Sequence, residues 1–305
     1  MKKLILALLL SAIIPAAHAV ESYIIIDNQT GAILESKKRT DKLQVASLTK
    51  IATALVVLDW ADLKKTDLSA TVEVPSEAMS NGATSSIGLK IGDSVSIRDL
   101  IYCALLSSDN VAALTLAHQV GGQIPNTEQL DPIGNFVAQM NALARSLFMK
   151  KTLFLNPAGI DNVPGQTLPY STAEDMARLT RYAYDKSSFA FYVAQKNREI
   201  HIIRDGVDIP TQIKNTNELL GKNGIDGVKT GRTRKAGDCL ILSADRPPES
   251  QRDGDSVTIT PRRIIVVLLG SEDRFGDGLA LMRKGWTLYD AWAAEGRLIK
   301  KGNAL

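Results

Sequence analysis

The sequence is poor in histidine. Of its 305 residues three are histidine, and because His18 belongs to an N-terminal leader described below, His118 and His201 are the two that remain. His118 lies in a helical apolar run and His201 among strand isoleucines, so we interpret both as structural. A Ser-His-Asp hydrolase is therefore disfavoured, and the scarcity also argues against a zinc site. We expect no metal and no cofactor.

Cysteine is equally scarce, with Cys103 and Cys239 as the only two. This number excludes the disulfide framework on which small secreted domains depend. Both cysteines have apolar neighbours, which favours buried free thiols. A single disulfide between them in an oxidising compartment stays open.

The chain also lacks a strong charge of either sign. Its 36 Lys and Arg against 33 Asp and Glu give a net charge of +3, and the basic residues are scattered. This distribution gives no support to nucleic-acid binding. Hydrophobic residues make up 45% of the chain, enough for a sizeable core, and we find neither repeats nor low-complexity segments.

Residues 1–19 have the pattern of a signal peptide: a charged start, an apolar run from Leu4 to Leu10, and Ala17-His18-Ala19 before Val20. A membrane anchor would need about 20 apolar residues, and this run is shorter. We expect cleavage after Ala19 and a mature peptidase domain of residues 20–305 in the periplasm. No later uncharged run is long enough to span a bilayer, so we expect no stable membrane anchor.

Periodicity predicts strands toward both chain ends and helices between them. A hairpin is expected over 23–34, helices over 47–58, 95–106, 110–120, 136–147 and 172–184 with Ser171 as cap, strands over 199–203, 207–209, 227–230, 239–244 and 264–269, a polar loop over 246–261, and a terminal helix over 279–292. This order predicts an α/β fold, an α+β sandwich. One mainly antiparallel sheet, completed by both chain ends, would be flanked by helices with a helical subdomain inserted.

The first of three short motifs is Ser47-Leu48-Thr49-Lys50, at a predicted helix start. A serine hydroxyl is a poor nucleophile until a base takes its proton, and residues three apart share a helix face. Lys50 is the candidate base. A free lysine is protonated at neutral pH. Burial and a second cation nearby would both lower its pKa, and Lys229 is the candidate for that cation. The alternative is a helix cap with a solvated lysine.

The second and third motifs are Ser108-Asp109-Asn110, between two helices, and Lys229-Thr230-Gly231, on a strand. Ser108 could pass a proton to a departing amine, and Asn110 could bond a substrate amide as donor and acceptor. Lys229 and Thr230 could bind a carboxylate, while Gly231 would let a substrate backbone approach the strand. Each motif alone also fits a cap or a turn, and their order gives them weight.

The ordered motifs resemble those of penicillin-binding proteins and class A β-lactamases, and most closely the low-molecular-weight D-alanyl-D-alanine carboxypeptidases. Segments such as Asn156-Pro157-Ala158-Gly159 and Lys235-Ala236-Gly237 extend the resemblance over nearly the whole mature chain. It implies a DD-peptidase/β-lactamase-like fold.

The resemblance also implies how the motifs act. Ser47 would form an acyl-enzyme with the penultimate D-alanine of a peptidoglycan stem peptide, with Lys50 as proton acceptor and Ser108 as proton relay. Asn110, Lys229, Thr230, Gly231 and Arg232 would bind substrate, the backbone N–H groups of Ser47 and Arg232 forming the oxyanion hole. β-Lactams would acylate Ser47 as substrate mimics.

The sequence departs from the family pattern at three points. Arg232 stands where His or Phe is common and Asp109 where several members have Gly, and Ala158 replaces a usual His, so we give its side chain no catalytic role. A C-terminal β-rich domain and a membrane-bound amphipathic helix, frequent in the family, are not expected here.

Three other functions stay open. Some single-domain relatives are endopeptidases that cut cross-links. A class A β-lactamase would need a Glu-x-x-Leu-Asn segment, which is absent between the second and third motifs. A non-catalytic peptidoglycan-binding protein would not need the reactive residues, all of which are present.

Overall fold

The computed structural model describes residues 20–80, 82–161, 167–254 and 256–305. The predicted signal peptide lies outside these residues. The described chain begins with a hairpin in which β1 (Ser22–Asp27) pairs antiparallel with β2 (Ile33–Lys37), as predicted. No helix in the described ranges has the length and apolar character needed to cross a bilayer.

Five strands form the main sheet in the order β2-β1-β9-β8-β7. The three late strands are β7 (Ile225–Thr233), β8 (Gly237–Asp253) and β9 (Ser256–Ser271), and all pairings are antiparallel. Because β1 lies between β2 and β9, early and late parts of the chain complete one sheet, as predicted. β7, which carries the third motif, is an edge strand of this sheet.

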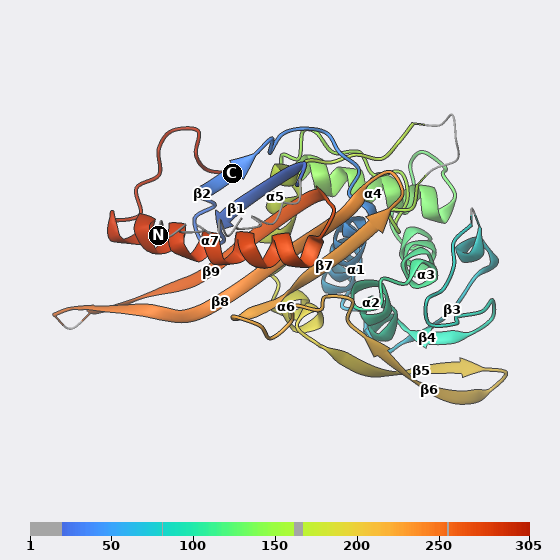
Figure 1. The fold of residues 1–305 in the computed structure, drawn as a ribbon. Coiled ribbons are helices and arrows are strands. Elements are labelled where there is room, and N and C mark those ends of the chain that lie inside the picture. Colours follow the sequence, from blue (N-terminus) through green and yellow to red (C-terminus); the bar gives the residue numbers. More distant parts are fainter. Residues whose placement is uncertain (1–19, 81, 162–166, 255) are drawn as a thin grey trace, which may run out of the picture.

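Apolar side chains of the main sheet alternate between its two faces, because successive strand residues point to opposite sides. One face packs under α7 (Arg274–Ala294), which lies across the sheet in Figure 1. The residues of this face include Ile25, Leu240, Leu242, Val266 and Leu268, and those of the opposite face include Ile24, Ile26, Ile241, Ile265 and Val267. A sheet covered on both sides explains the unbroken apolar runs in the sequence.

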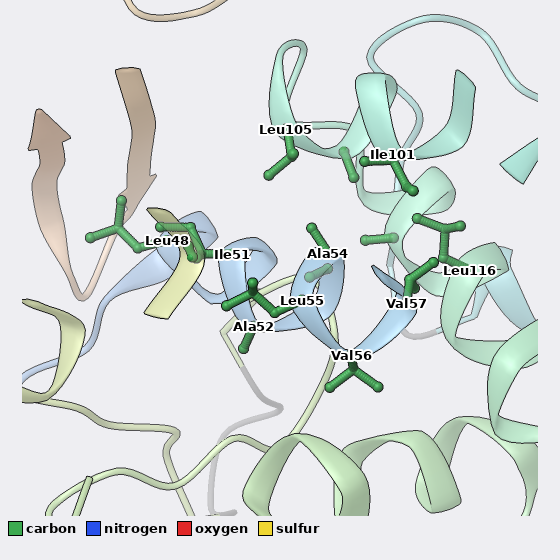
Figure 2. Packing of buried hydrophobic residues seen from close by; sticks show 14 of the residues in the cluster. Leu48, Ile51, Ala52, Ala54, Leu55, Val56, Val57, Ile101, Leu105 and Leu116 are labelled. Carbon is green, nitrogen blue, oxygen red and sulfur yellow. The ribbon is translucent and has the colours of Figure 1, made fainter. Parts of the chain in front are cut away.

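Helix α1 (Lys50–Lys64) lies inside the helical part of the molecule and is buried around most of its circumference. Figure 2 shows its side chains among those of α2 (Ile97–Leu105) and α3 (Asn110–Gly121). The remaining helices are α4 (Pro132–Ser146), α5 (Ala173–Tyr184), α6 (Ser187–Val193) and the 3-10 turns η1 (Ala46–Thr49) and η2 (Ser76–Met79). The neighbouring helices thus enclose most of α1, which begins at Lys50 of the first motif.

The prediction of one sheet is wrong, because a second sheet has the order β3-β4-β5-β6. Its strands are β3 (Thr71–Glu73), β4 (Ser94–Ser96), β5 (Asn197–Arg204) and β6 (Val207–Lys214). The strands predicted over 199–203 and 207–209 therefore exist but lie outside the main sheet. β3 and β4 have three residues each, too few to show an alternation in sequence.

The polar loop predicted over 246–261 is also wrong. β8 and β9 continue as a two-stranded arm to Asp253 and Ser256, and the arm extends past the rest of the sheet in Figure 1. The paired register shifts between Arg246 and Glu249, the positions flanking the two prolines. Proline cannot donate to a strand ladder but is accommodated at irregularities, so these prolines do not end the strand.

The predicted cap of α5 is wrong by one residue. Thr172, not Ser171, caps α5, accepting a hydrogen bond from Asp175 N at 3.0 Å. The backbone of Ser171 instead exchanges hydrogen bonds with Leu43. The pairing of Ser171 with Leu43, which the local sequence does not indicate, moves the cap by one residue.

Candidate active site

Ser47 and Lys50 meet at the start of α1. Ser47 lies in η1, which leads directly into α1 at Lys50. The Lys50 Nζ donates to Ser47 Oγ at 3.0 Å, so the spacing of three residues places the amine on the hydroxyl as predicted. The alternative of a solvated lysine is wrong, because Lys50 is 0% exposed.

The Lys50 amine has two further acceptors. It donates to Asn110 Oδ1 at 2.8 Å and to the carbonyl of Ala158 at 2.6 Å. Burial lowers the pKa of Lys50 to about 7, and the negative charge of Asp109 partly opposes this shift. A lysine with this pKa is substantially neutral near neutral pH, the state in which an amine can take a proton.

The Ala158 carbonyl was missed by reasoning from side chains. A turn over 156–160 presents it, because Asn156 Oδ1 accepts from the backbone N–H groups of Ala158, Gly159 and Ile160 at 3.1, 2.7 and 3.1 Å. The preceding carbonyl, of Pro157, accepts from Thr53 Oγ1 at 2.6 Å. The signal in the sequence was the Asn-Pro-Ala-Gly turn, whose function lies in its backbone.

The second motif joins α2 to α3, as predicted. Asn110 is the first residue of α3, and Asp109 caps that helix, accepting from Ala112 N at 2.8 Å. Ser108 is half-buried and has a left-handed backbone with φ of 59°. Such a conformation is uncommon for a residue other than glycine, and residues that adopt it are often found at functional sites. Here the Asp109 N–H, which donates to the Cys103 carbonyl at 3.0 Å, closes the turn.

The third motif lies on the edge strand β7, as predicted. Lys229 is 1% exposed and donates to the carbonyl of Thr230 at 3.0 Å. Of the two predicted causes of the lowered Lys50 pKa, burial is confirmed, whereas the charge of Lys229 is not among the causes of that shift. The pKa of Lys229 is itself lowered by burial and then by the positive charges of Lys50 and Arg274. The two lysines therefore share one electrostatic site.

Gly231 packs against the backbone at the nucleophile. A Cβ at this position would lie 3.1 Å from Ser47 N and 3.2 Å from Ala46 Cβ. These distances are tighter than ordinary contacts, so only glycine fits without displacement. β7 and the start of α1 are thereby brought together.

Thr216 links the second and third motifs. Its hydroxyl lies 2.6 Å from Thr230 Oγ1 and 3.1 Å from the carbonyl of Leu106, just before Ser108. Thr216 thus connects β7 to the chain just before the second motif. Thr216 belongs to the segment between β6 and β7.

Arg232 is held by a buried carboxylate. Its side chain is 68% exposed, and its guanidinium binds Asp238, which is 6% exposed, through both Nε and Nη2. Arg274, which sequence reasoning missed, donates to Asp238 Oδ1 at 3.3 Å and to the carbonyl of Gly231 at 3.2 Å. Arg274 thus adds a cation beside the third motif, although it follows that motif by more than forty residues.

His118, His201 and both cysteines are outside the three motifs. His118 is half-buried on α3, and His201 is exposed on β5 with Nδ1 2.9 Å from a carboxylate oxygen of Asp208. Cys103 and Cys239 are buried free thiols, which confirms the first interpretation, and burial raises the pKa of Cys239 to about 12. Within the described ranges no three His, Cys, Asp or Glu side chains are grouped to hold a metal ion.

The chain matches a protein-family model and several known sequences. A family model described as D-alanyl-D-alanine carboxypeptidase, peptidase family S11, matches residues 11–258. The chain is 31% identical over 231 residues to D-alanyl-D-alanine carboxypeptidase DacF of Bacillus subtilis, covering 75% of this chain and 55% of that protein. It is 28% identical over 268 residues to a D-alanyl-D-alanine endopeptidase of Pseudomonas aeruginosa, covering 86% and 76%. The chain therefore spans little more than half the length of the first relative.

Solved structures of the same kind share the fold. A Streptomyces DD-transpeptidase superposes with a TM-score of 0.74 at 28% identity, covering 89% of this chain and 98% of that one. A penicillin-binding protein from Listeria monocytogenes, in its cefotaxime-bound form, superposes with a TM-score of 0.68 at 26% identity over 88% and 97%. These likenesses confirm the predicted DD-peptidase-like fold. From its three ordered motifs, its fold and the family match over most of its length, the chain belongs to the D-alanyl-D-alanine carboxypeptidase family, peptidase family S11.

Proposed function

We propose that this chain is a serine-type D-alanyl-D-alanine carboxypeptidase that removes the terminal D-alanine of peptidoglycan stem peptides through an acyl-enzyme on Ser47. The observation that carries the proposal is the fully buried Lys50 amine, 3.0 Å from Ser47 Oγ, with a pKa lowered to about 7. A base of this kind makes a serine nucleophilic without histidine.

In the acylation step, neutral Lys50 takes the proton of Ser47 as Oγ attacks the carbonyl carbon of the penultimate D-alanine. The backbone N–H groups of Ser47 and Arg232 stabilise the oxyanion. The C–N bond to the last D-alanine then breaks, and the proton that Lys50 took passes through the Ser108 hydroxyl to the departing amine. Water later attacks the ester and frees the shortened peptide.

The third motif would select a substrate that ends in a carboxylate. Lys229 and Thr230 offer hydrogen-bond donors, and the neighbouring Arg274 guanidinium adds a positive charge. Charge-assisted hydrogen bonds to a carboxylate are strong. Asn110 holds Lys50 through its Oδ1, which leaves its amide N–H groups for a substrate carbonyl. β-Lactams carry a carboxylate beside the reactive amide, so we propose that they acylate Ser47.

A second candidate is DD-endopeptidase action on cross-linked peptides. The observation that favours it is the similarity to the Pseudomonas endopeptidase over 76% of that protein's length. Class A-like β-lactamase activity and a non-catalytic binding function have less support.

Incubation with a stem pentapeptide and with a cross-linked peptide dimer, followed by mass spectrometry, tests the proposal. We expect the pentapeptide to lose one D-alanine. Cleavage of the dimer alone would instead establish the endopeptidase, and rapid turnover of a chromogenic cephalosporin would establish a β-lactamase. Because the predicted leader directs export, we propose that the reaction occurs in the periplasm, which fractionation of cells would test.

The acylation rate should depend on pH through Lys50. Its pKa lies near 7, so the neutral, proton-accepting fraction increases as the pH rises through that value. We expect the second-order rate of labelling by a fluorescent penicillin to rise roughly tenfold between about pH 6 and about pH 8 and then level. A rate that is flat across this range would contradict the assignment of Lys50 as the base.

A further inference from the structure

Asp109 is a buried carboxylate whose two oxygens have different partners. The residue is 0% exposed, so its charge must be compensated by hydrogen bonds. Oδ1 accepts from Ala112 N at 2.8 Å. Oδ2 accepts from Ser85 Oγ, Ser86 N, Ser86 Oγ and Ile87 N at 2.7, 2.6, 3.1 and 3.3 Å.

The donors to Oδ2 belong to a segment that is distant in sequence. Residues 85–87 lie in the loop between η2 and β4, more than twenty positions before Asp109. The segment also reaches the second motif, because Ser86 Oγ donates to the carbonyl of Ser107 at 3.2 Å. The 85–87 segment thus contacts both the Asp109 carboxylate and the residue that precedes Ser108.

The other oxygen, Oδ1, is connected to Lys50 through helix α3. Oδ1 caps α3, and the first residue of that helix, Asn110, accepts from Lys50 Nζ at 2.8 Å. A cap fixes the backbone of the first helical turn. One carboxylate therefore ties together α3, the 85–87 segment and the turn that carries Ser108.

We propose that Asp109 is a positioning residue for the acylation of Ser47: Oδ1 fixes Asn110 against Lys50, and Oδ2 holds the 85–87 segment against the turn at Ser107 and Ser108. This inference rests on the proposed function for its kinetic consequence. Its structural part, the attachment of the 85–87 segment, is independent of that function.

Asp109→Asn is the variant that separates the two oxygens. The substitution keeps the size of the side chain and one acceptor oxygen but replaces the other with an NH₂ group. In either orientation of the amide, one set of N–H donors then faces another donor. We expect about tenfold slower labelling of Ser47 by a fluorescent penicillin, together with faster hydrogen exchange of the Ser86 and Ile87 amides.

The pH profile provides a readout that a purely structural role would not move. The charged groups coupled to Lys50 are Asp109 and Lys229. Asp109 raises the pKa of Lys50, so removal of its charge should lower that pKa and shift the rising limb of the acylation rate to lower pH. A slower rate with an unmoved limb would mean that Asp109 only stabilises the fold, and would overturn the proposal.

Asp93→Asn is the matched control. Asp93 is also a buried carboxylate and closes the same loop, accepting from Lys90 N at 2.8 Å and pairing with Arg204 at 2.7 Å. We expect Asp93→Asn to lower the melting temperature without shifting the pH at which the acylation rate rises.

Hydrogen exchange decides the structural part of the proposal. If the Ser86 and Ile87 amides exchange in Asp109→Asn at the same rate as in the unmodified protein, the inference is wrong whatever the labelling shows. If the unmodified protein is not labelled at all, the proposed function fails instead, and exchange alone decides the attachment of the 85–87 segment.

Discussion

Lys50→Ala is expected to abolish acylation of Ser47 while the chain still folds. The variant removes the amine that lies 3.0 Å from Ser47 Oγ. Loss of a general base costs about 10²- to 10⁴-fold in rate, so labelling by a fluorescent penicillin should fall by about 10³-fold. The second-order labelling rate near neutral pH measures the effect.

The stability of Lys50→Ala should fall moderately. Asn110 Oδ1 and the Ala158 carbonyl lose their donor, and a buried acceptor without a partner costs about 1–3 kcal/mol. The loss is partly offset, because burial of this amine is itself unfavourable, as its lowered pKa indicates. Circular dichroism and thermal melting would verify folding.

Lys64→Ala is the control for this variant, since Lys64 is exposed at the other end of the same helix. It should leave labelling unchanged. Penicillin labelling retained by Lys50→Ala would refute the assignment of the lysine as base, and another group would then have to activate Ser47.

Gly159→Ala is expected to damage both folding and acylation. The backbone at Gly159 has φ of +72°, and a Cβ there would lie 2.0 Å from the carbonyl oxygen of Ala46 and 2.8 Å from Thr49 Oγ1. Both residues belong to η1, which carries Ser47. Left-handed strain and overpacking together should reduce the free energy of unfolding by about 3 kcal/mol or more.

Gly206→Ala separates strain from overlap. Gly206 has a similar φ of +79°, in the turn between β5 and β6, but no atom lies within 4 Å of its potential Cβ. It should cost about 1 kcal/mol and leave the labelling rate unchanged. Urea denaturation and penicillin labelling of both variants make the comparison. Equal losses would show that contact with η1 is unimportant.

Local signals predicted most helices and strands of this chain, and non-local contacts account for the misses. The hairpin at β1 and β2 and the helix starting at Ser47 follow from turn residues and periodicity. The arm of β8 and β9 has polar residues and prolines that are typical of a loop, but cross-strand pairing keeps it extended. Likewise, polar and apolar residues alternate in β5 as expected for a strand, but the sequence of β5 does not indicate that it pairs with β4.

The sequence by itself determined the spacing of Ser47 and Lys50, because three residues along a helix start bring two side chains together whatever surrounds them. It also placed the third motif on a strand. Only the tertiary structure decided that Lys50 is fully buried, that the Ala158 carbonyl and Asn110 accept from it, and that Arg274 joins the third motif. Burial and the meeting of distant segments depend on the packing of the whole chain, and these set the pKa that makes Lys50 a base.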